Sequence, residues 1–221
     1  MITIILVDDH AVVRTGYRRL LDAEPGLRVV GEAARADEAN ALVMRTNPDV
    51  ALVDLSLKGS SGIEALRGML ARRPALKILV LSMHEDAGHI TQALRSGAHG
   101  YLTKHCEPGD VIDGIRQVAR GKNVFSAEIS RIMQAEHIGV GSTITPRNAP
   151  GTPDAINALT PREFDVFHMF IQGLSSMDIA GSMQLSPKTI LNNLTIIRQK
   201  LGVDNDVKLL HLAVRHGMMT M

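Results

Sequence analysis

The sequence predicts an α/β unit built on a five-stranded, doubly wound parallel sheet, followed by a second, small all-α unit. Residues 2–121 alternate short apolar runs with longer amphipathic stretches, which is typical of strand–helix repeats. The apolar runs, such as ITIILV and VALV, contain almost no polar residues, as expected for strands whose two faces are both covered. From residue 158 onward the pattern is helical only.

Five strand–helix pairs account for the first unit. The predicted strands are Ile2–Val7, Leu27–Ala33, Asp49–Val53, Lys77–Ser82 and Gly100–Thr103. The predicted helices are Ala11–Ala23, Ala36–Thr46, Gly62–Arg72, Ala87–Ser96 and Pro108–Arg120. Pairs of this kind form an open parallel sheet with helices on both faces, for which we expect the strand order 2-1-3-4-5.

Residues 122–157 interrupt this rhythm and have the composition of an interdomain linker. They contain GVGSTITPRNAPGTPD, which is rich in Gly, Pro, Ser and Thr, after a possible short helix at Ala127–Glu136. The chain therefore divides into 1–121, the linker, and a helical domain at 158–221.

Helix start and stop signals organise the last 64 residues into four helices. Thr160-Pro161-Arg162-Glu163 is a capping box with proline at the first helical position. Ser175 and Ser186 can cap the second and third helices, at Ser176–Met183 and Pro187–Leu201. Gly202 can end the third helix, and the fourth is expected at Asp204–His216. The second and third helices with their short turn predict a helix-turn-helix.

Composition excludes some classes of protein. Lys and Arg number 24 against 23 Asp and Glu, so net charge by itself makes no case for nucleic acid or membrane. The single cysteine, Cys106, excludes an internal disulfide and fits a reducing compartment. No apolar run approaches the ~18 residues that a membrane span needs, and the N-terminus lacks the basic region of a signal peptide. We expect a cytoplasmic protein without a membrane partner.

Acidic residues follow two predicted strands at the same edge of the sheet. Asp8 and Asp9 follow the first strand, and Asp54 follows the third, its expected neighbour. Three close carboxylates need a cation among them, and oxygen ligands suit Mg²⁺. Ser82 ends the fourth strand and Lys104 follows the fifth, so a hydroxyl and an ammonium reach the same edge. This set predicts a phosphoryl site with a carboxylate as acceptor, in preference to separate turn or helix-capping roles for each residue.

The motifs LVDDH, ALVDLSLKGSSG, VLSM and GAHGYLTK resemble those of the receiver domain of bacterial two-component response regulators. With LTPRE, LSPKT and KLGV in the helical domain, nearly the whole chain apart from the linker resembles the NarL/FixJ subfamily, whose output is a LuxR-type helix-turn-helix. The resemblance implies a flavodoxin-like sheet, a receiver domain at 1–121, and a four-helix DNA-binding domain at 158–221.

The resemblance also implies roles for individual residues. Asp54 would accept a phosphoryl group from the phosphohistidine of a sensor histidine kinase. Mg²⁺ would be held by Asp8, Asp9, Asp54 and the backbone carbonyl of Ser56. Ser82 and Lys104 would bind the phosphoryl oxygens, and Tyr101 would be the aromatic switch. The sequence departs from the family at Lys58, where proline is usual, and Lys58 could alter phosphorylation rates or be a solvated loop charge.

The third predicted helix of the small domain has two faces at about 100° per residue. Ile190, Leu194, Ile197 and Leu201 form the expected core stripe, and Lys188, Asn192, Thr195 and Gln199 lie opposite, with Leu191 and Arg198 on one shoulder. If this face enters the major groove, Asn192 and Gln199 can bind adenine, while Leu191 and Thr195 can contact thymine methyl groups. Lys188, Arg198 and Lys200 would hold phosphates. A solvated polar face on a small helical bundle is the alternative.

Further departures concern DNA reading. A basic residue is usual in the family at Leu191, and a histidine at Asn193, so sequence preference should differ from that of lysine-bearing relatives. Low charge predicts weak binding by a monomer, which two half-sites of an inverted repeat bound by a homodimer would offset. Along the last helix, Val207, Leu210, Val214 and Met218 suit either the core or a dimer contact.

Three functions are compatible with these features. The first is a response regulator transcription factor, in which phosphorylation of Asp54 controls dimerisation and sequence-specific binding of double-stranded DNA. The second is a phosphatase or phosphotransferase that turns over at Asp54, but Ser56 is a poor general acid at the position where one is needed. The third is a phosphorylation-controlled protein-interaction switch with weak or lost DNA reading. We favour the first, with self-phosphorylation and autodephosphorylation as the only enzymatic activities.

Overall fold

The computed structural model describes residues 1–57, 60–135, 138, 156, 158–215 and 218. Contacts divide the chain into two compact units, Met1–Val140 and Gly141–Met221. Within the described ranges, no helix combines the length and the apolar character needed to cross a membrane. The expected loop around Lys58 and most of the expected linker, at 139–155 and 157, lie outside these ranges.

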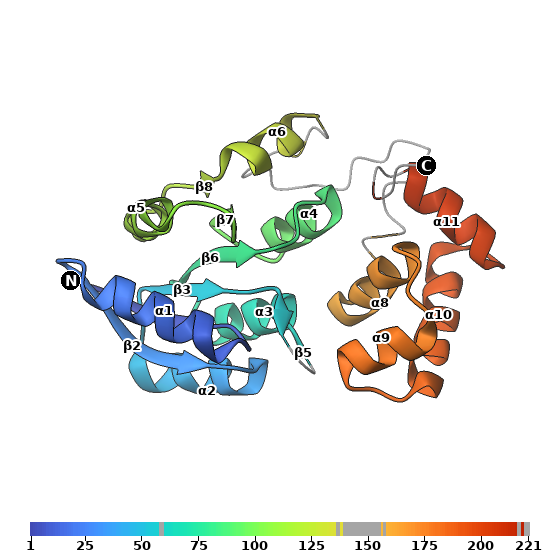
Figure 1. The fold of residues 1–221 in the computed structure, drawn as a ribbon, viewed down its shortest axis with the longest axis horizontal. Coiled ribbons are helices and arrows are strands. Elements are labelled where there is room, and N and C mark those ends of the chain that lie inside the picture. Colours follow the sequence, from blue (N-terminus) through green and yellow to red (C-terminus); the bar gives the residue numbers. More distant parts are fainter. Residues whose placement is uncertain (58–59, 136–137, 139–155, 157, 216–217, 219–221) are drawn as a thin grey trace. The chain divides into compact units, whose positions relative to one another are not determined.

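A parallel sheet forms the centre of the first unit (Figure 1). Its strands are β1 (Ile2–Val7), β2 (Leu27–Ala33), β3 (Val50–Val53), β6 (Lys77–Ser82), β7 (Gly100–Thr103) and β8 (Val124–Phe125). They lie in the order β2-β1-β3-β6-β7-β8, and every neighbouring pair is parallel. The predicted order 2-1-3-4-5 is confirmed, and β8 is an additional two-residue strand at the edge, beside β7.

A short hairpin follows β3. It pairs β4 (Ser56–Leu57) with β5 (Ser60–Ser61) in antiparallel fashion. The Ser61 hydroxyl then accepts a hydrogen bond from the Ile63 N–H and caps helix α3. Two residues on each side are too few for any periodicity, so the sequence pattern contains no sign of this hairpin.

Helices cover both faces of the sheet (Figure 1). The helices are α1 (Ala11–Asp22), α2 (Ala36–Thr46), α3 (Gly62–Arg72), α4 (Ala87–Arg95), α5 (Pro108–Ala119) and α6 (Ala127–Ala135). Apolar residues of α1 and α5 pack on one face of the sheet, and those of α2, α3 and α4 pack on the other. This division explains why the central strands β1, β3, β6 and β7 are mostly apolar, because both of their faces are covered, whereas β2 at the edge exposes Arg28 and Glu32.

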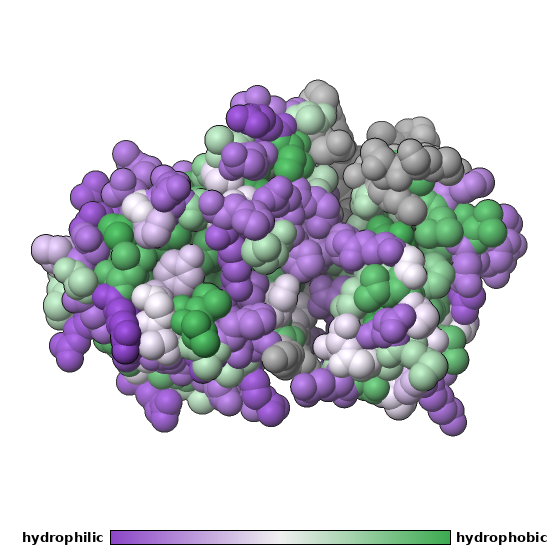
Figure 2. All heavy atoms as spheres, viewed as in Figure 1, coloured by the Kyte–Doolittle hydropathy of each residue, from purple (hydrophilic) through white to green (hydrophobic). Residues whose placement is uncertain are grey.

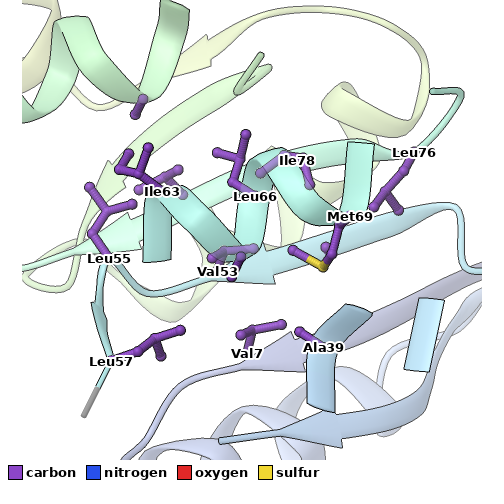
Figure 3. Close-up of a cluster of buried hydrophobic side chains, with 14 of the residues drawn as sticks. Val7, Ala39, Val53, Leu55, Leu57, Ile63, Leu66, Met69, Leu76 and Ile78 are labelled. Atoms are coloured by element: carbon purple, nitrogen blue, oxygen red, sulfur yellow. The ribbon is translucent and has the colours of Figure 1, made fainter. Parts of the chain in front are cut away.

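The core on the α2–α3–α4 face is close-packed (Figure 3). In this view Val53 lies next to Ile63 and Leu66 of α3, and Val7 lies between Leu57 and Ala39 of α2. Ile129 and Met133 of α6 belong to the same core. Helix α6 therefore packs against the first unit, although residues 122–157 as a whole have linker composition.

The second unit consists of α8 (Pro161–Ile171), α9 (Ser176–Met183), α10 (Pro187–Leu201) and α11 (Asp206–Arg215). The predicted capping box at Thr160 and Glu163 is confirmed, as are caps by Ser175 and Ser186. Helix α9, a turn in which Gln184 has a φ of 54°, and α10 form the predicted helix-turn-helix. Helix α11 begins two residues later than predicted, because the side chain of Asn205 accepts a hydrogen bond from the Lys208 N–H and marks the helix start.

Hydrophilic residues cover most of the face of the molecule that is drawn in Figure 2, and apolar residues are scattered among them. The apolar side chains are instead concentrated in the two cores of the first unit and the single core described for the second. Burial of these side chains is the main source of stability for both units.

Among the glycines that the structure describes, Gly62 leaves the least room for a side chain. A Cβ atom there would lie 2.2 Å from the carbonyl oxygen of Asp54 and 2.4 Å from the Cα of Leu55. We predict that Gly62→Ala destabilises the protein by about 3 kcal/mol, because backbone atoms next to the acidic edge have to move. The midpoint of urea unfolding measures this loss.

Gly16→Ala is the matched control, since a Cβ atom on Gly16 meets nothing within 4 Å and the residue lies inside α1. This change should raise stability by about 0.5–1 kcal/mol through helix propensity. Equal midpoints for the two variants would contradict the packing argument.

Candidate functional site

Three carboxylates meet at the carboxyl edge of the sheet. Strands β1 and β3 are paired in parallel and end in register, so that Asp8 and Asp54 follow neighbouring strand ends. Oxygens of Asp8, Asp9 and Asp54, together with a ring nitrogen of His10, lie within 4.8 Å of one another. The structure thus brings together the acidic residues that the sequence singles out.

Lys104 connects two of these carboxylates. It follows β7, and its backbone N–H donates a 2.9 Å hydrogen bond to the Ser82 carbonyl of neighbouring β6. Its Nζ lies 2.7 Å from Asp8 Oδ2 and 2.6 Å from Asp54 Oδ2. Only 2% of the Asp54 side chain and 13% of the Lys104 side chain are exposed. The ammonium therefore neutralises acidic groups in a largely dry environment, where attraction between charges is strong.

Burial and pairing shift the pKa values of this cluster. Burial raises the pKa of the Asp54 carboxyl group, and the hydrogen bonds from Lys104 offset only part of that rise. Burial alone would lower the pKa of Lys104, but its hydrogen bonds to Asp54 and Asp8 outweigh this effect, and the pKa is raised. The ammonium of Lys104 and the carboxylate of Asp54 thus favour each other's charged forms.

Ser82 and Tyr101 lie near this cluster, on adjacent strands. Ser82 is fully buried, and its hydroxyl accepts a 3.1 Å hydrogen bond from the His84 N–H. The Tyr101 ring is also fully buried, and its hydroxyl donates a 2.8 Å hydrogen bond to the His84 carbonyl. Burial raises the pKa of Tyr101 well above that of free tyrosine. The backbone of His84 thus links the two residues.

Three residues that contact the site, His10, Arg14 and His84, are absent from the sequence-based prediction. His84 Nε2 lies 3.0 Å from the Ser56 hydroxyl, and the Ser56 N–H donates to Asp54 Oδ1 at 3.1 Å. Arg14 donates to the Asp8 carbonyl at 2.6 Å. A signal for His84 does exist, because it lies two residues beyond Ser82, which ends β6 at the same edge of the sheet. Arg14 has no comparable signal, since its reach depends on its side-chain conformation.

Helix α10 of the second unit has one buried and one exposed face. The buried residues are the predicted Ile190, Leu194, Ile197 and Leu201. The exposed residues include the predicted Lys188, Leu191, Asn192, Thr195 and Gln199. The exposed fraction of Leu191 is 53%, which is high for a leucine, so the face combines amides, a hydroxyl and an apolar side chain. Such a face offers groups for base edges and few for phosphates.

Two of the cations expected to hold phosphates are in ion pairs. Arg198 Nη1 lies 2.9 Å from Asp206 Oδ1, and Lys200 Nζ lies 2.6 Å from Glu163 Oε2. Burial would raise the pKa of Glu163, but hydrogen bonds from Lys200 and Thr160 lower it below its usual value. The usable positive charge of α10 is therefore smaller than the sequence suggests.

The most buried residues of the last helix lie beside the predicted stripe of Val207, Leu210, Val214 and Met218. Leu209 and Ala213 are fully buried, whereas Val207 is 62% exposed and Leu210 and Met218 are partly buried. Leu210 and Met218 pack against the core, so the predicted stripe belongs partly to the core and is exposed at Val207.

A parallel sheet with clustered carboxylates, a buried hydroxyl and a lysine at its carboxyl edge defines a phosphoacceptor, or receiver, domain. A helix-turn-helix with an exposed polar face on its second helix defines a DNA-binding domain. The two together define the response regulators. Comparison with known protein families agrees: residues 4–116 match the response regulator receiver domain, and residues 157–213 match the bacterial regulatory proteins of the luxR family.

Individual relatives extend this similarity over the whole chain. The response regulator UvrY of Escherichia coli is 34% identical over 218 residues, 99% of this chain and 96% of UvrY. GacA of Pseudomonas aeruginosa is 33% identical over 218 residues, 99% of this chain and 98% of GacA. RcsB of Salmonella enterica serovar Typhimurium, in a structure with promoter P1flhDC and the phosphomimetic BeF3⁻, has a TM-score of 0.60 and 25% identity, covering 95% of this chain and 96% of RcsB. The chain belongs to the NarL/FixJ family of response regulators.

Removal of the Lys104 charge tests the electrostatics of the acidic cluster. We predict that Lys104→Gln lowers stability by about 3 kcal/mol at pH 7.5, because two buried carboxylates lose their cation. The loss should shrink at pH 5.5. The pKa of Asp54 is raised in the folded state, so the native state binds the additional proton and stability falls as the pH rises through that value.

Urea unfolding in EDTA at both pH values measures this effect. Lys122→Gln removes the same charge from an exposed position after α5 and should change little. If Lys104→Gln lowers the stability equally at both pH values, the proposed charge interaction between Lys104 and the two carboxylates is contradicted.

Proposed function

We propose that Asp54 accepts a phosphoryl group from the phosphohistidine of a sensor histidine kinase, and that this modification controls dimerisation and sequence-specific DNA binding. The observation that carries the proposal is the contact of Lys104 with both Asp54 and Asp8 at the carboxyl edge of the sheet. In this arrangement the receiver domain comprises residues 1–121, residues 122–157 connect the domains, and residues 158–221 bind DNA.

The transfer itself is a displacement at phosphorus. A carboxylate oxygen of Asp54 forms a bond to phosphorus while the bond between phosphorus and the imidazole nitrogen breaks, and the electron pair stays on the imidazole. Lys104 neutralises the phosphoryl oxygens and the Ser82 hydroxyl donates to one of them. Burial raises the pKa of Asp54, and the hydrogen bond and charge of Lys104 favour the carboxylate form that acts as the nucleophile.

The oxygen donors of the site fit a magnesium ion. Carboxylate oxygens of Asp8, Asp9 and Asp54 lie close enough together to share one small cation, and hard oxygen ligands are those that Mg²⁺ prefers. The Ser56 carbonyl would be the remaining protein ligand. When bound, Mg²⁺ would supply positive charge to the phosphoryl oxygens.

The hydrogen bonds around His84 support a switch. If the Ser82 hydroxyl turns to a phosphoryl oxygen, the His84 N–H loses its present acceptor, and the carbonyl of the same residue holds the Tyr101 hydroxyl. Phosphorylation would thereby favour one of two arrangements of the β6–α4 loop.

The chemistry ends at the acyl phosphate and its slow hydrolysis. Ser56 occupies the position two residues after Asp54 and is a poor general acid, so a phosphatase or phosphotransferase that turns over at Asp54 is disfavoured. Self-phosphorylation and autodephosphorylation are the enzymatic activities that we propose.

The exposed face of α10 would read the major groove. Asn192 and Gln199 would bind adenine edges, Leu191 and Thr195 would contact thymine methyl groups, and Lys188 would hold a phosphate. A homodimer on an inverted repeat would offset the weak binding of a single low-charge domain. The report of RcsB with promoter DNA and a phosphomimetic supports this proposal, and DNA as the target implies a cytoplasmic protein.

Acetyl phosphate labelling tests the acceptor. We predict that the wild-type protein is phosphorylated only when Mg²⁺ is present and that Asp54→Asn abolishes the label, as measured by phosphate-affinity electrophoresis and intact mass. Asp49→Asn is the matched control, because Asp49 precedes the same strand at its opposite end and should leave labelling unchanged. Normal labelling of Asp54→Asn would exclude Asp54 as the acceptor.

Random-oligonucleotide selection with phosphorylated protein tests DNA reading. We expect an enriched inverted repeat. Asn192→Ala should weaken binding of that sequence about 10-fold and relax the preference at one position in each half-site, as expected for loss of a pair of hydrogen bonds to a base. Asn193→Ala, an identical change at a half-buried neighbour, should have a smaller effect.

No enriched sequence, with labelling of Asp54 intact, would favour the alternative function, a phosphorylation-controlled protein-interaction switch. The exposed Leu191 on α10 is the observation that keeps this alternative open.

A further inference from the structure

We propose that Asp206 restrains DNA binding by holding the Arg198 guanidinium away from the phosphate backbone. Arg198 lies in the last turn of α10, and Asp206 is the first residue of α11. Arg198 Nη1 lies 2.9 Å from Asp206 Oδ1, and Nη2 is also 3.4 Å from the Thr195 hydroxyl. The proposal rests on the DNA-binding function of the helical domain.

Arg198 is placed beside the reading face. It follows Leu191 by seven residues and Thr195 by three, and residues at these separations lie on one side of a helix. Leu191 and Thr195 are both exposed. When this face enters a major groove, the groups at its shoulder meet the sugar–phosphate backbone, so an uncommitted cation at Arg198 would bind phosphate.

The ion pair changes that contribution. The guanidinium and the carboxylate cancel each other's charge, and 55% of the Asp206 side chain is exposed at the same shoulder. A paired cation displaces few counterions from DNA, and separating the pair leaves a carboxylate close to phosphates. An exposed ion pair is weak, so Asp206 weakens phosphate binding without preventing it.

The helical domain has a small positive net charge, so the loss of one free cation is a large relative change. Residues 158–221 contain six Lys and Arg against five Asp and Glu, and Lys200 is paired with Glu163. Because Asp206 also pairs with Arg198, the affinity for DNA depends more on contacts with bases and on the second half-site bound by a dimer. Asp206 would therefore lower non-specific binding more than specific binding.

Asp206→Asn tests this role in the full-length protein treated with acetyl phosphate and Mg²⁺. The probe is a duplex of about 30 base pairs with arbitrary sequence, and anisotropy gives Kd at KCl concentrations between about 50 and 200 mM. We expect Asp206→Asn to bind about fivefold more tightly at low salt. The slope of log K against log salt should steepen by about 0.9, the value for one additional phosphate contact.

Asp204→Asn is the matched control. It removes the same charge two residues earlier, but its partner is Lys208 of α11, at 2.8 Å, and not a cation of the reading helix. It should leave the salt slope unchanged. Arg198→Ala in the Asp206→Asn background should remove the gain in affinity. Asp206→Ser also removes the carboxylate but keeps a residue that is favourable at a helix start. The same gain in affinity with this variant would show that the effect does not come from a weakened α11.

Three results would overturn the proposal. Weaker binding by Asp206→Asn would mean that Asp206 orients Arg198 for a productive contact. An equal gain in affinity for Asp204→Asn would mean that only the net charge of the domain matters. A gain in affinity that persists after Arg198→Ala would mean that Asp206 acts by repelling phosphates and not through Arg198. If no variant binds the duplex, the proposal that α10 binds DNA is itself contradicted. This outcome differs from the three results above, in each of which the protein binds.

Discussion

The contact of one ammonium group with two buried carboxylates is the interaction on which the rest of this structure depends. Lys104 lies 96 residues from Asp8 and 50 from Asp54 in the sequence. Only the parallel order of the strands brings β1, β3 and β7 to a common edge and allows this contact. The packing of helices on both faces of the sheet is therefore what makes a reactive carboxylate possible at that edge.

The ionised form of Asp54 by itself opposes folding. A carboxyl group with a raised pKa is more stable in its neutral form, so ionisation of Asp54 at neutral pH reduces the stability of the native state. The apolar cores on the two faces of the sheet compensate for this loss. A phosphoryl group at Asp54 would change the balance of charge around Lys104 and the hydrogen bonds of the Ser82 loop together, which is how a local modification can select between two conformations.

Much of the fold follows from the sequence, for identifiable reasons. The bounds of β1, β2, β6 and β7 agree with prediction, and charged residues mark the ends of β1 and β7, at Asp8 and Lys104. The acidic edge follows as well, because parallel topology fixes where strand ends meet. Strand β8 and the β4–β5 hairpin have two-residue strands, too short to carry a pattern. The ion pairs of Arg198 and Lys200 also escape prediction, because Asp206 and Glu163 become their neighbours only through packing of the helices.

Coupling between the two domains is the central claim, and the affinity of the full-length protein for its selected inverted repeat tests it most directly. Kd would be measured with and without acetyl phosphate, for the wild-type protein and for Asp54→Asn. The account predicts that phosphorylation tightens binding of the wild-type protein by about 10-fold or more, a typical coupling between sites, and leaves Asp54→Asn unchanged. Equal affinities of the phosphorylated and unphosphorylated wild-type protein would contradict it.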